Sequence, residues 1–130
     1  FLIPANTFTT GSAVELKFLA RKAGGLGSGA INMYLNTSDT LVGATQISRL
    51  ITSANGQSFI KGRRDFIVKS STITEYLSGT TSSVNDHNTF TVAASQTNIN
   101  WAIDQYIIPS LQLGNAGDSL TLSYVNIIKA

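Results

Sequence analysis

Apolar and polar residues alternate along much of this chain. In residues 14–21 every second side chain is apolar, at Val14, Leu16, Phe18 and Ala20. Residues 31–36 repeat the pattern with Ile31, Met33 and Leu35. A period of two places successive side chains on opposite faces of a β-strand, so each run predicts a strand with one buried face. Apolar residues at helical spacing do not recur, and the sequence therefore predicts an all-β chain.

Polar and glycine-rich segments separate these runs. Residues 24–29 are rich in glycine, which adopts positive φ at little cost, and they predict a hairpin connection or a mobile loop. The Asn55–Gly56 pair predicts a second hairpin, because this pair favours tight turns between strands. Residues 61–65 indicate a turn that enters a strand, and residues 79–88 have the composition of a long surface loop.

The last run is apolar on both faces. Residues 120–124 alternate, whereas Val125, Ile127 and Ile128 then occupy both faces. Such a strand is covered on both sides, by a loop, by a bulge that switches its faces, or by a neighbouring subunit. Upstream, Pro109 lacks the N–H group that a β-ladder uses, so it predicts an edge position, a bulge or a strand break.

Together the runs predict about eight to ten short strands in an antiparallel two-sheet β-sandwich that is jelly-roll-like. The length of 130 residues suits a single domain, 1–130, whose hydrophobic core is large enough without a metal or disulfide. The chain opens with the apolar Phe1, and its first residues lack the basic n-region of a signal peptide, so we expect it to be the C-terminal part of a longer chain.

Composition narrows the classes of partner. The chain has no cysteine, which excludes disulfides, thiolate zinc sites and cysteine nucleophiles. Charged residues make up 12% and the net charge is +2, without a long run of either sign, so we expect no nucleic-acid binding. No segment approaches the roughly 18 apolar residues of a membrane span, and we expect no membrane insertion. Instead, 15 Ser, 15 Thr, 10 Asn and 5 Gln supply most of the polarity.

Catalytic signatures are weak. The single histidine, His87, lies in the polar loop 79–88, and no Gly-x-Ser-x-Gly elbow presents a nucleophile. The carboxylates are scattered singly, whereas glycoside hydrolysis needs a facing pair. Neither the spacing of a calcium loop nor a lysine after the 24–29 glycines is present. The sequence predicts no enzyme, no catalytic residue, no cofactor and no metal.

Two groups of residues are candidates for contacts. The basic segment 61–65 and the aromatic residues suit acidic groups and sugar rings, and their candidates are Tyr34, Arg63, Arg64, Asp65, Tyr76 and Trp101. Each also has a purely structural interpretation: the arginines can pair with Asp65 or with a neighbouring subunit, and Trp101 can plug one end of a sandwich with its indole N–H bonded to backbone. The last run supplies candidates for a subunit interface: Tyr124, Val125, Ile127 and Ile128.

Several stretches resemble bacteriophage structural proteins, specifically the β-sandwich heads at the C-termini of phage fibres and virion appendages. These stretches are 1–8, 35–39, 98–107 and 118–124. The resemblance implies a jelly-roll-like, non-enzymatic homotrimer in the virion that contacts other virion proteins and attaches to a host-surface glycan or protein, or decorates the capsid. It carries over no ligand residue. The alternative is a carbohydrate-binding module of a secreted bacterial enzyme or adhesin, which would be extracellular and monomeric.

Overall fold

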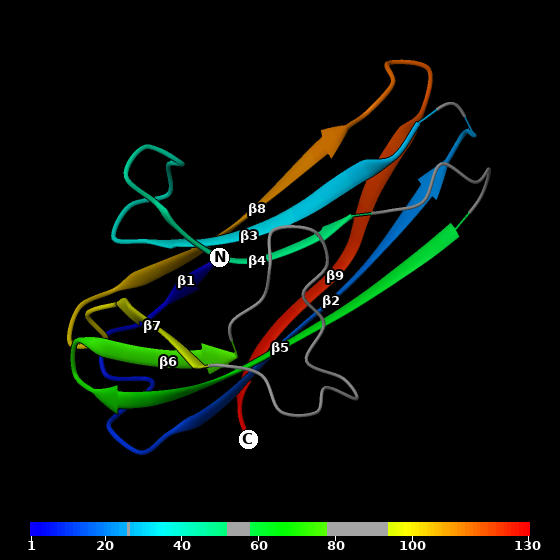
Figure 1. Ribbon diagram of the computed structural model, residues 1–130. Helices are drawn as coiled ribbons and strands as arrows, with labels where there is room; N and C mark the ends of the chain where they lie inside the picture. The colour runs from blue at the N-terminus through cyan, green and yellow to red at the C-terminus, as the bar shows by residue number, and fades with distance from the viewer. Residues whose placement is uncertain (26, 52–57, 78–93) are drawn as a thin grey trace.

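The computed structural model describes residues 1–25, 27–51, 58–77 and 94–130, and these contain strands but no helix (Figure 1). A four-stranded antiparallel sheet has the order β1-β8-β3-β4, and a five-stranded antiparallel sheet has the order β7-β6-β5-β2-β9. The strands are β1 (Leu2–Ile3), β2 (Ala13–Ala23), β3 (Gly29–Asn36), β4 (Thr45–Ile51), β5 (Ser58–Ser70), β6 (Ile73–Leu77), β7 (Ala94–Asn98), β8 (Gln105–Leu113) and β9 (Ser119–Lys129). The predicted all-β, two-sheet fold is confirmed.

Three pairs of consecutive strands account for most of the sandwich, and in each pair, called a ribbon below, one strand lies in each sheet. The central ribbon, β2–β3, places β2 in the five-stranded sheet and β3 in the four-stranded sheet. The ribbon β4–β5 pairs along one side of it and β8–β9 along the other, so both sheets contain the same three ribbons in the same lateral order. Two facing antiparallel sheets of this kind form a β-sandwich.

This arrangement corrects the two predicted hairpins. Residues 24–29 connect β2 to β3, and these strands lie in different sheets, so the segment crosses the sandwich. The segment that contains Asn55–Gly56 likewise connects β4 to β5 across the sheets, and the pair itself lies outside the described residues. Glycine-rich chemistry permits a tight reversal of the chain, but the pairing partner of each strand is chosen by long-range packing.

The alternating runs fill the space between the sheets as predicted. Val14, Leu16, Phe18 and Ala20 are buried, and so are Ile31, Met33 and Leu35 on the facing sheet. Trp101 closes one end of this core. Its ring meets the edge of Phe8 at a centroid distance of 5.3 Å and stacks on Phe66 at 6.0 Å. Its indole N–H donates a 2.8 Å hydrogen bond to the hydroxyl of Thr74, where backbone had been the expected acceptor.

A bulge explains why the last strand is apolar on both faces. β9 pairs with β2, and the register shifts between Leu19 and Ala20. Because of this shift, an inward face holds Leu120 and Leu122 before the bulge and Val125 and Ile127 after it, and all four pack against the core. The sequence left a loop, a bulge or a neighbouring subunit as the cover of this strand. For these four residues the bulge is the explanation.

A buried ion pair lies at the end of the sandwich where β2 connects to β3 and β8 connects to β9, which we call the folded end. The Lys22 ammonium lies 3.1 Å from the Asp118 carboxylate, and both side chains have no exposed surface. Asp118 accepts a 2.9 Å hydrogen bond from the Gly27 N–H, and Lys22 donates to the Gly24 carbonyl. Gly24 has a φ of 92°, and a Cβ there would overlap the Asp118 carboxylate. The pair therefore joins the β2–β3 crossing to the β8–β9 crossing and requires glycine between them.

Candidate functional surfaces

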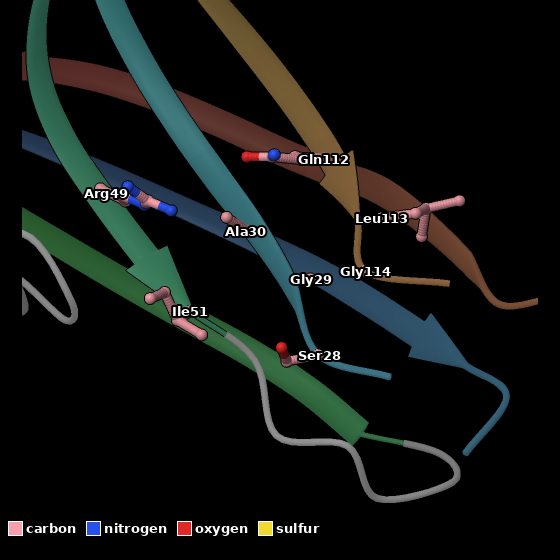
Figure 2. A pocket seen from close by; sticks show the side chains of 8 residues that line it. All are labelled: Ser28, Gly29, Ala30, Arg49, Ile51, Gln112, Leu113 and Gly114. Carbon is pink, nitrogen blue, oxygen red and sulfur yellow. The ribbon is translucent and has the colours of Figure 1, made fainter. Parts of the chain in front are cut away.

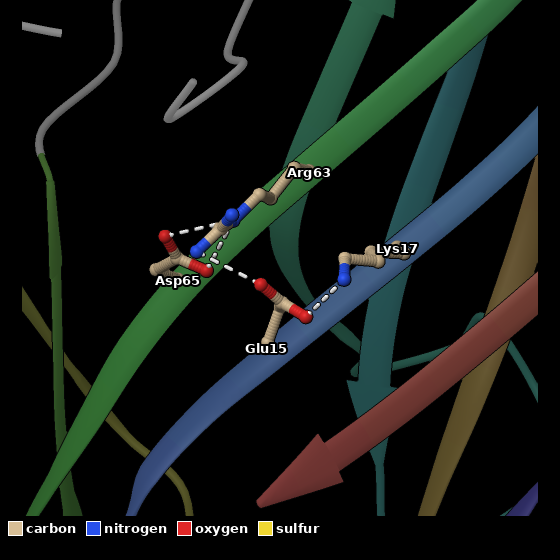
Figure 3. Close-up of polar contacts among 4 residues, drawn as sticks. All are labelled: Glu15, Lys17, Arg63 and Asp65. Atoms are coloured by element: carbon tan, nitrogen blue, oxygen red, sulfur yellow. Dashed lines mark hydrogen bonds and ion pairs between the residues drawn. The ribbon is translucent and has the colours of Figure 1, made fainter. Parts of the chain in front are cut away.

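The outer face of the five-stranded sheet carries a cluster of four charged side chains (Figure 3). Cross-strand pairing places Glu15 of β2 opposite Asp65 of β5, and Lys17 opposite Arg63. One Glu15 oxygen lies 2.5 Å from the Lys17 ammonium, and the other lies 2.8 Å from the Arg63 guanidinium. Arg63 Nε lies 3.0 Å from Asp65. Glu15 thus bridges two cations, and the cluster joins β2 to β5.

The surroundings of Glu15 set its ionisation. The hydrogen bond from Lys17 lowers the pKa of Glu15 below its ordinary value, burial opposes this by raising it, and the positive charges of Arg63 and Lys17 lower it further. The net direction is downward, so Glu15 is a carboxylate at neutral pH. Its two cations remain about two-fifths exposed, at 43% for Lys17 and 39% for Arg63, which limits the strength of the pairs.

A hollow of about 490 Å³ lies beside this cluster. Its lining includes Lys17, Leu19, Lys61, Arg63 and Tyr124, together with Phe18 and Gly62. Gly62 sits opposite Phe18 in the β2–β5 ladder, and a Cβ at Gly62 would overlap the Phe18 ring. The Phe18 ring therefore covers the glycine. Residues 61–65 lie within β5, so the turn predicted for this segment is wrong.

The predicted contact residues do not form one site. Arg63 and Asp65 belong to the charged cluster, whereas Arg64 lies on the opposite face of β5, only 2% exposed, opposite Leu16. Trp101 is also 2% exposed and packs as part of the core, so its ring presents no stacking face. Tyr34 is half-buried on the other sheet, and the side chain of Tyr76 lies outside the described part of the structure.

The four-stranded sheet holds a candidate contact residue that sequence reasoning missed. Arg49 is the sole charged residue in its four described strands. It borders a hollow of about 140 Å³ on the outer face, near the folded end (Figure 2). In the sequence, Arg49 stands out only as an isolated cation within an otherwise neutral segment. Its position becomes informative only once its neighbours in the sheet are known.

The side of the sandwich bordered by β8 and β9 is apolar and open in the described structure. Among the described strands β9 pairs only with β2, and beyond Ile107, whose backbone hydrogen-bonds to Phe1, β8 pairs only with β3. Leu111 lies opposite the buried Ile31 and so shares its inward face, yet it is 39% exposed, and Leu113 is 41% exposed. Pro109 occupies this edge, as one of its three interpretations predicted. Of the predicted interface residues, Val125 and Ile127 face inward along this side, whereas Tyr124 and Ile128 face outward and are exposed.

Within the described ranges, no group of three or more His, Asp or Glu side chains is placed to hold a metal ion. His87 and the loop 79–88 fall outside these ranges. No described helix has the length and apolar character needed to cross a bilayer.

Comparisons with protein-family models, with curated proteins and with solved structures gave no match. The fold and the two outer faces are therefore the basis for assigning a role.

Proposed function

We propose that this chain is a non-catalytic structural subunit, the homotrimeric head domain of a phage fibre or virion appendage, which attaches to a host surface or decorates the capsid. The resemblance of residues 1–8, 35–39, 98–107 and 118–124 suggests the setting. The open side along β8 and β9 suggests how copies assemble.

That open side is the observation that carries the proposal. β9 has 11 residues, contains no proline and has only one charged residue, Lys129, at its end. β8 has no charged residue at all. Monomeric proteins usually protect such edges with charges, prolines or a covering segment, because unpaired backbone groups beside apolar side chains promote association. Pro109 protects part of β8, but β9 has no proline and no charge before Lys129, and such a weakly protected edge fits a surface that another subunit covers.

The alternative, a carbohydrate-binding module with an aromatic platform, loses its main residue because Trp101 is buried. The half-buried Tyr34 and the exposed Tyr124 do not form a row on one face, because Tyr34 lies on the four-stranded sheet and Tyr124 on the five-stranded sheet. We therefore favour a structural subunit.

Light scattering coupled to size exclusion, at micromolar protein, tests the proposal directly. The expected mass is about three times the 13.8 kDa of the chain. A monomer at every concentration would overturn the proposal, because the β8–β9 side would then be a solvated surface. A stable dimer would retain self-association and overturn the trimeric head.

A further inference from the structure

The hollow beside Arg49 is built by three neighbouring strands. β4 lies on one side of β3 and β8 on the other, and Ala30 of β3 pairs with Ile51 on one side and Gln112 on the other. Arg49 stands in the next outward row, opposite Asn32. Figure 2 shows the side chains of Arg49 and Gln112 extending toward β3 from the two flanking strands. The small side chain of Ala30 leaves the space between them.

One polar atom beside this hollow lacks a partner within the described structure. The Nε of Arg49 is buried without a hydrogen bond. None of the described acidic side chains pairs with its guanidinium, and the described ion pairs all lie in the five-stranded sheet or at the folded end. Burying a polar group without a partner is unfavourable, and more so for a charged group. An acceptor bound in the hollow beside Arg49 would therefore satisfy this buried N–H donor.

The chemistry of the lining selects the acceptor. A guanidinium is a planar fork of N–H donors that matches a carboxylate. Gln112 and Ser28 add an amide and a hydroxyl, which suit the hydroxyls of a sugar, while Ile51 and Leu113 add apolar contacts. At about 30 Å³ per water, the 140 Å³ hollow has room for roughly four waters, enough for a carboxylate and the carbons next to it. The remainder of a longer ligand would lie outside, along the neutral polar face.

We propose that this hollow binds the carboxylate of an acidic sugar, such as a uronic acid residue of a surface polysaccharide, with Arg49 on the carboxylate and Gln112 on a neighbouring hydroxyl. The exposed amide of Gln46 fits the rest of a saccharide, because its 3.1 Å hydrogen bond to the buried Asn32, beside Arg49, orders it on that face. Its biological meaning, recognition of a host-surface glycan, rests on the proposed attachment function.

The test is a titration of the intact protein with methyl glucuronide, methyl glucoside and inorganic phosphate, followed by NMR chemical shifts. We expect saturable binding of the glucuronide in the millimolar range, and binding of the glucoside and of phosphate weaker by at least tenfold. Equal binding of the glucoside would overturn the role of the carboxylate. Equal binding of phosphate would overturn the assignment to a sugar acid, because any small anion would then fit.

Three variants locate the site. Arg49→Gln removes the guanidinium and Ala30→Leu fills the hollow while leaving Arg49 in place, and each should weaken glucuronide binding at least tenfold. Lys69→Gln removes the same charge from an exposed position on the other sheet and should leave binding unchanged. Binding that survives both Arg49→Gln and Ala30→Leu would overturn the site. The mass of each assembly is measured in the same samples, so a failure of binding is distinguished from a failure of the trimer.

Discussion

The ion pair of Lys22 and Asp118 is the most demanding contact in the molecule, because both charges are removed from water. Breaking a buried pair by changing one partner leaves the other charge uncompensated, at a cost of about 3–5 kcal/mol. Asp118→Asn should therefore lower the free energy of unfolding by about this amount, measured by urea denaturation. Gly27 would also lose the carboxylate oxygen that accepts its N–H.

Ser119→Asn is the matched control for this change. It introduces the same side chain one residue further along, where the position is exposed, and should change stability by less than about 0.5 kcal/mol. A double variant, Lys22→Met with Asp118→Leu, should recover much of the loss, since apolar residues of similar size often replace a buried pair at little cost. If Asp118→Asn were as stable as the parent protein, the pair would not hold the two sheet crossings together.

The cluster of Glu15, Lys17 and Arg63 joins β2 to β5, and its effect on stability should depend on pH. Because the folded state lowers the pKa of Glu15, its contribution is complete above the ordinary value of 4.5 and is lost as the pH falls through that value and through the lower folded pKa. Glu15→Gln should therefore lower Tm at pH 7, and the difference should shrink as the pH falls below about 4. Thermal denaturation of both proteins across pH measures this.

Exposure and salt set the size of that effect. The partly exposed cations predict a small Tm difference that decreases further at high ionic strength. Asp39→Asn, in the exposed loop between β3 and β4, is the control and should show little dependence on pH. A Tm difference for Glu15→Gln that is constant from pH 7 down to pH 2 would assign its role to packing rather than to charge.

Strands could be predicted from this sequence, whereas their partners could not. Alternation identified β2 and β3 because burial of one face imposes a period of two on the residues themselves. The connection after β2 was predicted as a hairpin or a mobile loop, and the one after β4 as a hairpin. Both join strands of different sheets, because turn-forming residues do not determine the sheet of the next strand. Similarly, Arg63 and Asp65 are two residues apart and could be paired by inspection. Their contact with Glu15 depends on the β2–β5 register, which joins distant parts of the chain.

Isolated residues escaped prediction for a related reason. Arg49 forms no motif, and its interest comes from the absence of other charges in the strands around it. Arg64 was predicted to contact a ligand together with its neighbours, but alternation along β5 turns it toward the interior. A basic run within a strand is divided between two faces, so a cluster in sequence is not a cluster on a surface.

At the scale of the whole molecule, the proposed trimer is expected to assemble through the open side along β8 and β9. Leu111 is 39% exposed on this side, and a charge there would have to be buried against a neighbouring subunit. Leu111→Asp should therefore convert the trimer to monomer in light scattering, with a far-UV spectrum that remains β. Ile127 is a poorer probe because it faces inward and packs against the core, so changing it would also unfold the sandwich.

Leu41→Asp provides the comparison, since Leu41 is 48% exposed but lies in the loop between β3 and β4, away from β8 and β9. It should leave the mass unchanged, because a charge at a solvated loop position costs little. A trimer that persists in Leu111→Asp but dissociates in Leu41→Asp would move the interface from the β8–β9 side to the β3–β4 loop. Dissociation in Leu111→Asp alone would place the subunit contact along β8 and leave both outer faces, with Arg49 and the Glu15 cluster, available to ligands.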